Sequence, residues 1–376
     1  MRIRLPLVLR LPHIVAATAV MMLHACADPN AEAVRQQEAI DSVAAAKAQL
    51  EHMRRVDSIT NRFPRIDYVR TVIRDVAMRD SIRATFGAAD STWTAYRAFT
   101  AVNRKDIQFF RVGDTIMLPS TLEKDLRAYS VFPQWYEGGR DVEKIIFISN
   151  KWQSYACYSY GELVRFAAAN TGEEGKPTFP GRYAVNWKSR FRISSLDSTW
   201  KLPFTVNFHQ YAGSAFHQFE MPGRPVSHSC VRQFLSDAEW LFKWVRQGKR
   251  DTNGRPIKFT GTPVIILDMF DYGRRRGGPW WDVTSNKDVL IALPNKPLDV
   301  EEALIPISQI PKEVRGALPN ASRYRQAEAI LRERGVIRDS ARLKESVDWN
   351  KVRAERRRKK AAEAARKAAQ QDSVGG

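Results

Sequence analysis

The most informative segment of this chain reads Ala215-Phe216-His217-Gln218-Phe219-Glu220-Met221-Pro222-Gly223-Arg224-Pro225-Val226-Ser227-His228-Ser229-Cys230-Val231-Arg232. It places two histidines close to a cysteine, and His209 lies shortly before it. A cysteine thiol has an unperturbed pKa of about 8.5, so it needs a neighbouring imidazole to react as a thiolate at neutral pH. The clustering therefore indicates a nucleophilic cysteine with a histidine base.

Short β-rich runs surround this segment. The patterns of apolar and β-branched residues predict strands over residues 144–148, 152–160, 163–168, 182–187 and 262–267. Turn residues over 176–181 separate two of these runs, and a single helix is predicted over 236–245, directly after the cysteine. The fold class expected is a mainly β domain, a compact sandwich or barrel with one helix after the nucleophile, extended by α-helices at both ends.

The segment resembles the active-site motif of YkuD-type L,D-transpeptidases. Members of that family read aliphatic-His-Gly, then Leu-Pro-Gly-x-Pro-Ala, then Ser-His-Gly-Cys-Val-Arg, and the spacing fits here without an insertion. Further matches follow the family's order over about residues 142–268: Asn170-Thr171-Gly172, Pro177-Thr178-Phe179-Pro180-Gly181-Arg182-Tyr183, Leu202-Pro203-Phe204, Asp237-Ala238 and Gly261-Thr262-Pro263-Val264-Ile265-Ile266. Several ordered matches are far more specific than one Ser-His-x-Cys string.

The resemblance implies that Cys230 is the nucleophile and His217 its base, with His228 and Ser227 lining the same cleft. The substrate implied is the tetrapeptide stem of peptidoglycan. Attack next to its terminal D-alanine would give a thioester, which an amine of a neighbouring stem would resolve into a 3→3 cross-link. Backbone N–H groups near Ser229 and Cys230 would stabilise the oxyanion, and Arg232 would hold a substrate carboxylate. No cofactor and no metal are implied.

Two positions depart from the family motif. Ser229 replaces the glycine before the nucleophile, and a serine there would be strained if the backbone needs a positive φ. Gln218 replaces the glycine after the base, and its side chain is expected to narrow the cleft or to reset His217. Activity is therefore less firmly implied than the fold.

Other interpretations stay open at this level. His217, His228 and Cys230 could ligate zinc, although no CxxC or HExxH pairing accompanies them. His209 fits a hydrogen-bonded strand histidine better than a second base. The domain could also be a catalytically silent wall-binding protein, or a carboxypeptidase in which water resolves the thioester. The acceptor could equally be a lipoprotein amine or a free D-amino acid.

The N-terminus resembles a bacterial export signal. Arg2, Arg4 and Arg10 precede an apolar run over residues 11–23, which is too short to span a bilayer comfortably. The tetrapeptide Leu23-His24-Ala25-Cys26 resembles a lipobox, which implies that Cys26 is lipidated and anchors an exported lipoprotein to a membrane; a plain secretory signal is the alternative. Ala27, rather than aspartate, favours the outer membrane. Cys157 would then be a buried structural cysteine.

The remaining regions are expected to be helical or wall-binding. We predict a signal peptide over 1–25, a helical stalk over 26–95 with helices at 31–59 and 66–86, a LysM-like segment over 96–140, the catalytic domain over 141–270, an extension over 271–345 that turns helical after 297, and a basic helical tail over 346–376. The LysM-like features are the strings over residues 101–106 and 111–119, although strings of the second kind also close ordinary β-hairpins. The formal net charge of +19 favours anionic partners, and export argues against nucleic acid.

Overall fold

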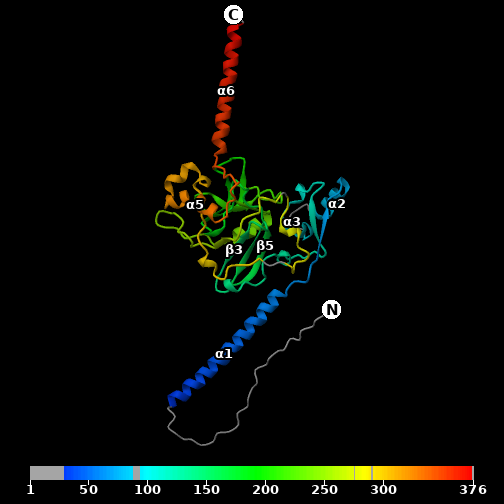
Figure 1. Cartoon of the computed structure of the whole chain (residues 1–376), viewed down its shortest axis with the longest axis vertical. Coiled ribbons are helices and arrows are strands. Elements are labelled where there is room, and N and C mark those ends of the chain that lie inside the picture. Colours follow the sequence, from blue (N-terminus) through cyan, green and yellow to red (C-terminus); the bar gives the residue numbers. More distant parts are fainter. Residues whose placement is uncertain (1–28, 88–93, 275, 289–290, 375–376) are drawn as a thin grey trace. The chain divides into compact units, whose positions relative to one another are not determined.

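The computed structural model describes residues 29–87, 94–274, 276–288 and 291–374 (Figure 1). The chain divides into two compact units, the first ending at Asp57 and the second beginning at Ser58. The first unit consists of most of helix α1 (Pro29–Thr60), whose apolar residues such as Val34 and Val43 are exposed. The predicted helix is confirmed, whereas the signal peptide and Cys26 lie outside the described residues. Among the described helices, none is long and apolar enough to cross a membrane.

The described part of the second unit contains three sheets, two large ones and a two-stranded one. The five-stranded sheet has the order β5 (Glu162–Ala168), β4 (Ser154–Ser159), β3 (Ile145–Ser149), β11 (Pro263–Ile266), β6 (Gly181–Ala184). The four-stranded sheet has the order β10 (Val231–Gln233), β9 (Ser214–Gln218), β8 (Lys201–His209), β7 (Trp187–Ile193). Most pairs are antiparallel, but β3 pairs parallel with β11 and β9 pairs parallel with β10. The expected mainly β fold is confirmed.

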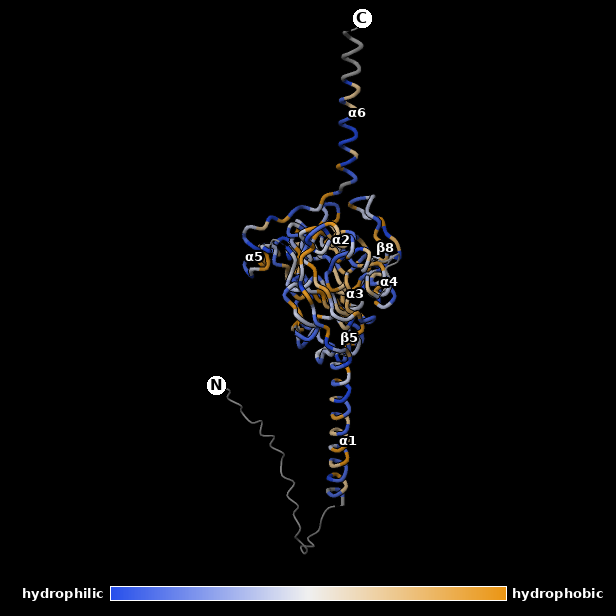
Figure 2. Tube along the Cα trace, turned by 90° about the vertical axis from the view of Figure 1, so that its right-hand side faces the viewer, coloured by the Kyte–Doolittle hydropathy of each residue, from blue (hydrophilic) through white to orange (hydrophobic). Residues whose placement is uncertain are grey.

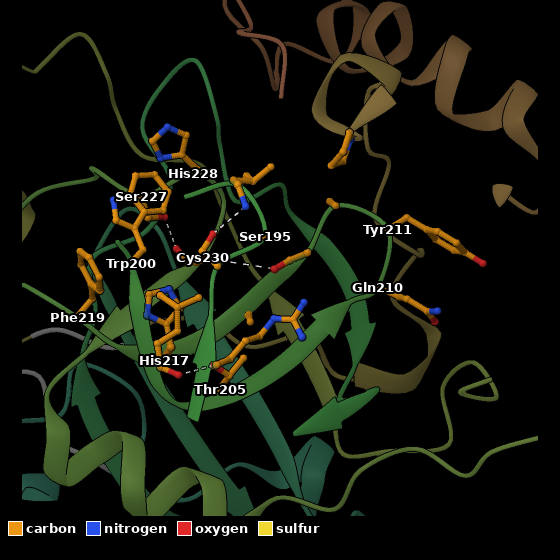
Figure 3. A pocket seen from close by; sticks show the side chains of 18 of the residues that line it. Ser195, Trp200, Thr205, Gln210, Tyr211, His217, Phe219, Ser227, His228 and Cys230 are labelled. Atoms are coloured by element: carbon orange, nitrogen blue, oxygen red, sulfur yellow. Dashed lines mark hydrogen bonds between the residues drawn. The ribbon is translucent and has the colours of Figure 1, made fainter. Parts of the chain in front are cut away.

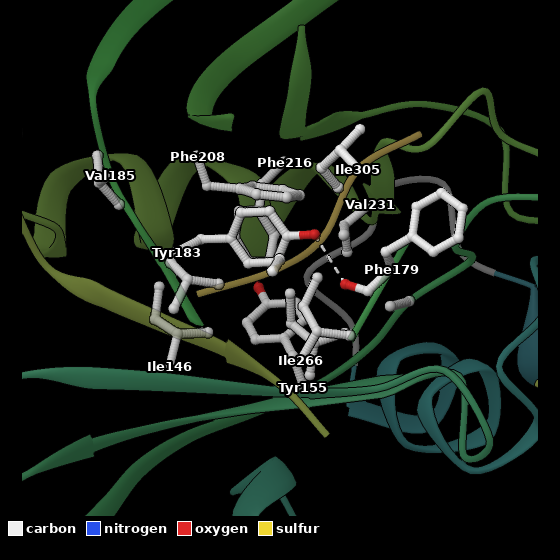
Figure 4. Packing of buried hydrophobic residues seen from close by; sticks show 14 of the residues in the cluster. Ile146, Tyr155, Phe179, Tyr183, Val185, Phe208, Phe216, Val231, Ile266 and Ile305 are labelled. Carbon is white, nitrogen blue, oxygen red and sulfur yellow. Dashed lines mark hydrogen bonds between the residues drawn. The ribbon is translucent and has the colours of Figure 1, made fainter. Parts of the chain in front are cut away.

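One hydrophobic core lies between the two sheets (Figure 4). Tyr155 of the five-stranded sheet packs edge-to-face on Phe216 of the four-stranded sheet, with ring centroids 5.4 Å apart. Helix α4 (Leu235–Trp244) adds Leu241 to this core, close to its predicted position. Cys157 is fully buried in the same core. This packing fixes β9 and β10, which carry the residues around the cysteine.

The five-stranded sheet is buried on both faces. Along β3, Ile146 and Ile148 point into the core between the sheets, whereas Ile145 and Phe147 point into a second core on the other face. Successive side chains of a strand face opposite sides, so a continuous apolar run is what a two-sided strand requires. The second core includes residues of helix α3 (Thr94–Asn103) and of the short helices η2 (Leu126–Tyr129) and η4 (Pro279–Trp281).

A βααβ unit precedes the large sheets. Strands β1 (Tyr68–Val72) and β2 (Thr115–Pro119) pair antiparallel, and α2 (Val76–Phe86) and α3 lie between them in sequence. Ile73, Phe99 and Ile116 belong to its small core. The helix predicted over 66–86 is therefore wrong for residues 66–75, because residues 68–72 pair with β2 and helix α2 begins only at Val76. A boundary at residue 95 also cuts through this unit. The short helix η1 (Ile107–Phe109) precedes β2.

The C-terminal part packs back onto the two large sheets before it ends in a helix. It runs through η5 (Pro297–Asp299), η6 (Ile307–Gln309), η7 (Lys312–Ala317) and α5 (Ala321–Glu333). Ala327 and Leu331 of α5 enter the core between the sheets. The last helix, α6 (Trp349–Val374), is mostly hydrophilic (Figure 2), as predicted for the basic tail. The remaining short helix, η3 (Glu137–Gly139), precedes β3.

Candidate active site

Strands β9 and β10 place the candidate residues on one face. In their parallel register Val231 lies opposite Phe216, and Arg232 lies opposite His217. Phe216 and Val231 are fully buried in the core. Because side chains alternate along a strand, His217 and Arg232 face the other side, together with Cys230 directly before β10. The alternation of side chains along the two strands therefore directs His217, Cys230 and Arg232 away from the core.

These residues line a cavity of about 370 Å³. Five of the seven predicted site residues lie on its wall: Cys230, His217, His228, Ser227 and Arg232. Figure 3 shows the side chains of Cys230, His217, His228 and Ser227 together with Trp200, Tyr211 and Phe219. Trp200 directly precedes β8, Tyr211 lies between β8 and β9, and Phe219 directly follows β9. Gln218 and Ser229 are not among the lining residues. The predicted effect of Gln218, a narrower cleft or a reset His217, stays a prediction.

His217 is held in one orientation by the backbone. It is 4% exposed, and its Nδ1 lies 3.0 Å from the carbonyl oxygen of Gln218. A carbonyl oxygen only accepts hydrogen bonds, so Nδ1 carries the proton and Nε2 keeps a free lone pair. Burial lowers the pKa of His217 to about 4, against the opposing effect of this hydrogen bond. His217 is thus a neutral imidazole at neutral pH, with Nε2 able to take up a proton.

Cys230 is half-buried beside β9. Its Sγ lies 3.8 Å from the carbonyl oxygen of Gly213. Burial raises the pKa of the Cys230 thiol, and a hydrogen bond from the Ala215 backbone N–H and the charge of Arg232 oppose this rise. The resting pair is therefore a neutral thiol and a neutral imidazole, so the thiol needs a base at the moment of attack.

Ser229 has the left-handed backbone that the family glycine suggested. Its φ is +74°, where a residue with a Cβ is disfavoured by roughly 1–2 kcal/mol. The serine side chain compensates, because Ser229 Oγ lies 2.8 Å from Ser214 Oγ inside the protein. Thr178 Oγ1 also donates to the Ser229 carbonyl oxygen at 3.2 Å. The strain expected at this position is present, and local hydrogen bonds hold the loop in it.

The turn after β5 holds the same loop in place through hydrogen bonds. The Thr171 carbonyl oxygen accepts hydrogen bonds from both Val226 N and Ser227 N, each at 3.0 Å. Glu173 N donates to the Ser227 carbonyl oxygen at 2.9 Å, and Ser227 Oγ donates to the carbonyl oxygen of Cys230. The residues from Asn170 to Thr178, which match the family motif, therefore stabilise the loop before Cys230 by hydrogen bonds.

Arg232 ties the loop to the strand while it faces the cavity. Its guanidinium donates to the carbonyl oxygens of Glu220 at 3.4 Å and Val226 at 3.5 Å and lies 4.5 Å from the centre of the Phe219 ring. Burial lowers the pKa of Arg232. No carboxylate forms a salt bridge with it in the described part of the chain. The guanidinium is thus available for a ligand carboxylate as well.

His228 and Trp200 form a second side of the cavity. Their ring centroids are 5.2 Å apart, and burial lowers the pKa of His228.

His209 lies elsewhere: its Nδ1 accepts a hydrogen bond from Ala212 N at 3.0 Å, and it does not line the cavity. Within the described ranges, no group of three or more His, Cys, Asp or Glu side chains is arranged to hold a metal ion.

Sequence reasoning missed the part of the cavity wall that comes from the C-terminus. Glu313, Val314 and Asp348 line the same space as Cys230. Arg353 also binds Asp197 in the loop between β7 and β8, with N–O distances of 2.6 and 2.8 Å. No local motif predicts these contacts, because they join segments more than eighty residues apart in the sequence. The one sequence signal near Trp200 is the matching motif Leu202-Pro203-Phe204, which begins two residues later.

Comparison with known proteins identifies the central region. Residues 143–266 match the family model described as the L,D-transpeptidase catalytic domain, YkuD. No curated protein matches the chain.

Several solved structures are similar to part of the chain. An L,D-transpeptidase from Xylanimonas cellulosilytica (residues 123–326) shares 20% identity over 54% of this chain and 98% of its own, with a TM-score of 0.30. One from Stackebrandtia nassauensis shares 20% identity over 34% of this chain and 57% of its own, with a TM-score of 0.28. One from Mycobacterium smegmatis shares 16% identity over 33% of this chain and has a TM-score of 0.27; the match spans 58% of its length.

Proposed function

Because residues 143–266 form an L,D-transpeptidase catalytic domain of the YkuD type, we propose that this protein is a peptidoglycan L,D-transpeptidase with a Cys230 thioacyl intermediate. The observation that carries the proposal is that a thiol and a neutral imidazole line the same cavity. Cys230 provides a thiol, and His217 provides an imidazole whose Nδ1 proton is engaged by the Gln218 carbonyl oxygen, which leaves Nε2 as the base. This is the arrangement that acyl transfer by a neutral thiol requires.

The first half-reaction forms the thioester. His217 Nε2 takes the Cys230 proton while Sγ attacks the carbonyl carbon that joins the third stem residue to the terminal D-alanine. We assign the oxyanion of the tetrahedral intermediate to backbone N–H groups at Ser229 and Cys230. The C–N bond then breaks, D-alanine leaves as an amine after taking the proton from His217, and the tripeptide remains on sulfur.

The second half-reaction releases the product. The side-chain amine of the third residue in a neighbouring stem attacks the thioester carbon, and His217 accepts a proton from it. The C–S bond breaks, and the Cys230 thiol is restored as the new amide forms between two third residues, which is a 3→3 cross-link. Water as the acceptor would give the carboxypeptidase, and a lipoprotein amine would give anchoring.

We assign substrate-positioning roles to the other cavity residues. Arg232, which faces no carboxylate of its own among the described residues, suits a stem carboxylate. Ser227 holds the carbonyl of Cys230, and His228 with Trp200 offers a flat surface for the stem. The Gln218 contribution is its backbone carbonyl group rather than its side chain. No metal or other cofactor takes part in these steps.

We also propose that the protein is an exported lipoprotein anchored through Cys26. The basic residues, the short apolar run and the lipobox-like tetrapeptide support this proposal. The anchor would face the periplasm or cell wall, with the outer membrane favoured by Ala27. The substrate is an anionic wall polymer, which agrees in sign with the basic chain.

The experiment is incubation of purified protein lacking residues 1–28 with disaccharide-tetrapeptide, followed by mass spectrometry of the products. Loss of D-alanine together with a covalent dimer is expected, and Cys230→Ala and His217→Ala should abolish both. Loss of D-alanine with a monomeric tripeptide product would instead identify a carboxypeptidase. Intact substrate with folded wild-type protein would favour a catalytically silent wall-binding protein.

A further inference from the structure

We propose that Arg353 and Asn350, near the start of helix α6, are positioning residues for the proposed reaction, because they hold the loop of residues 194–200 on the wall of the cavity at Cys230. This inference rests on the proposed function. The loop, here called the 194–200 loop, connects β7 to β8. Its residues Ser194, Ser195, Leu196 and Trp200 line the same cavity as Cys230. The position of this loop therefore determines the shape of the space that a stem peptide would enter.

The 194–200 loop provides an aromatic wall beside the nucleophile. The ring centroids of Trp200 and His228 are 5.2 Å apart (Figure 3), and His228 stands two residues before Cys230 in the chain. Hydrogen bonds close the loop on itself: Ser194 N donates to the Trp200 carbonyl oxygen, and Trp200 N donates to the Asp197 carbonyl oxygen, each at 3.0 Å. The loop is therefore a preformed turn, and Trp200 moves with it as one unit.

The strands that carry this loop leave its end weakly supported. Among the described strand pairs, residues 201–205 of β8 pair with β7 alone, because the pairing of β8 with β9 begins only at Val206. Phe204 packs on Phe242 of α4, but the last four residues of β7, 190–193, are all exposed. A two-stranded ribbon with little buried surface is marginally stable in water. The end of the ribbon therefore needs a further contact to stay beside Cys230.

Helix α6 supplies this contact through side-chain hydrogen bonds. The Arg353 guanidinium donates to both carboxylate oxygens of Asp197, at 2.8 and 2.6 Å. Asn350 Nδ2 donates to the Ser195 carbonyl oxygen at 3.1 Å, and Asn350 Oδ1 accepts from Ser198 N at 2.9 Å. A single exposed ion pair contributes little to stability, but the Asp197 side chain is only 8% exposed and its pairing is bidentate. Arg353 and Asn350 thus fix the loop from a distant segment of the chain.

The start of α6 is itself attached to the cavity wall. Asp348 caps the helix by accepting hydrogen bonds from Asn350 N at 2.9 Å and Lys351 N at 3.2 Å. Lys351 Nζ lies 3.0 Å from a carboxylate oxygen of Glu313. Asp348 and Glu313 both line the cavity. The residues that hold the loop and the residues that border the cavity therefore belong to one hydrogen-bonded group.

The segment before α6 is also bound to the turn that stabilises the nucleophile loop. Lys344 N donates to the Gly175 carbonyl oxygen at 2.8 Å, and Lys344 Nζ lies 2.8 Å from a carboxylate oxygen of Glu173. Glu173 N in turn donates to the Ser227 carbonyl oxygen at 2.9 Å. The C-terminal segment thus contacts both the 194–200 loop and the support of the nucleophile loop, and it sets the distance between them.

Loss of the α6 contacts should change substrate binding and not the chemical step. The positions of Cys230 and His217 follow from β9 and β10, whose residues Phe216 and Val231 are buried in the core. The position of Trp200 depends instead on the 194–200 loop. A substitution that frees the loop removes a binding surface for the stem, which raises KM and leaves kcat nearly unchanged.

The test is steady-state kinetics of protein lacking residues 1–28 with disaccharide-tetrapeptide. Asn350→Ala/Arg353→Ala should raise KM about tenfold and keep kcat within about twofold of wild type. Arg353→Lys keeps the charge without the planar fork, so its KM should lie between those of wild type and Arg353→Ala. The matched control is Arg357→Ala, because Arg357 is exposed on the same helix and forms no hydrogen bond or salt bridge within the described residues; its KM should equal that of wild type. Circular dichroism checks that every variant is folded.

A second readout follows the loop without turnover. Alkylation of Cys230 by iodoacetamide, located by peptide mapping, should be about threefold faster in the double variant, because a freed loop exposes the thiol. Cys157 is fully buried and serves as the internal reference, since its alkylation should stay slow in every folded variant.

Several outcomes would overturn the assignment. An unchanged KM in the double variant would do so, as would a fall in kcat at constant KM or an alkylation rate equal to that of wild type. An equal rise of KM in Arg357→Ala would assign the effect to the charge of the helix and not to the loop contacts. If wild-type protein turns over no substrate while alkylation is still faster in the double variant, the proposed function fails and Arg353 and Asn350 still hold the loop.

Discussion

The carbonyl oxygen of Gln218 lies 3.0 Å from Nδ1 of His217, the residue directly before it in β9. This contact involves the backbone of Gln218 and not its side chain. It explains how a position that is glycine in the family motif can hold glutamine here. The orientation of the His217 imidazole therefore depends on the backbone of β9 and not on which side chain stands at position 218.

Replacing the Gln218 side chain should therefore have little effect. Gln218→Ala and Gln218→Gly are expected to keep the acylation rate of Cys230 by a carbapenem within about threefold of wild type, because the carbonyl acceptor is retained. The rate is followed by intact-protein mass spectrometry. A loss of a hundredfold or more in Gln218→Ala would mean that the side chain takes part directly.

The pH dependence of acylation follows from the neutral resting pair. His217 has its pKa lowered to about 4 by burial, and burial raises the pKa of Cys230. The acylation rate should stay nearly constant from about pH 5.5 to 8 and fall by half near pH 4, where His217 becomes protonated. Circular dichroism at each pH checks that the protein is folded. An acid limb centred at 6.5 or above would contradict the neutral pair.

The same lowered pKa predicts how stability changes with pH. An unfolded histidine titrates near 6.5, so between about pH 6.5 and 4 the unfolded chain binds a proton that native His217 does not. The free energy of unfolding should fall through this window as the pH decreases, by up to about 3 kcal/mol from His217. Urea unfolding of wild type and His217→Gln tests this, and the loss should be smaller in the variant by about 2 kcal/mol at pH 4.5. Parallel curves would exclude a buried neutral His217.

Ser229 offers a test of backbone strain at the nucleophile loop. Ser229→Gly relieves the positive φ but removes the hydrogen bond to Ser214, so its stability should stay close to wild type. Ser229→Ala keeps the strain and loses the bond, and it should be less stable than the glycine variant by about 1 kcal/mol. Urea unfolding measures both. Equal stability of the two variants would show that this backbone is unstrained in solution.

The fold around Cys230 and His217 could be predicted from the sequence for a physical reason. Cys230, His217 and their loop belong to a nearly continuous segment, and the alternation around Phe216 and Val231 dictates which residues face the core. The continuous apolar run at residues 145–148 likewise predicts a strand. Information of this kind is local, so one sequence is enough to expose it.

Other parts could not be predicted because they depend on distant partners. Strand β1 was read as helix, since only its pairing with β2, more than forty residues later, makes it a strand. The C-terminal residues Glu313 and Asp348 reach the cavity at Cys230 through tertiary packing. A cavity of about 590 Å³ is likewise lined by separate segments that contain Lys105, Pro222 and Trp281. No periodicity in the sequence predicts these tertiary contacts.

The most direct test of the central claim is detection of the thioacyl enzyme itself. Wild-type protein is mixed with disaccharide-tetrapeptide, quenched in acid within seconds, and analysed by intact mass and peptide mapping. The account predicts an adduct equal to the substrate minus D-alanine, located on Cys230, absent from Cys230→Ala and formed at least a hundredfold more slowly in His217→Ala. Release of D-alanine at the wild-type rate by Cys230→Ala would contradict it.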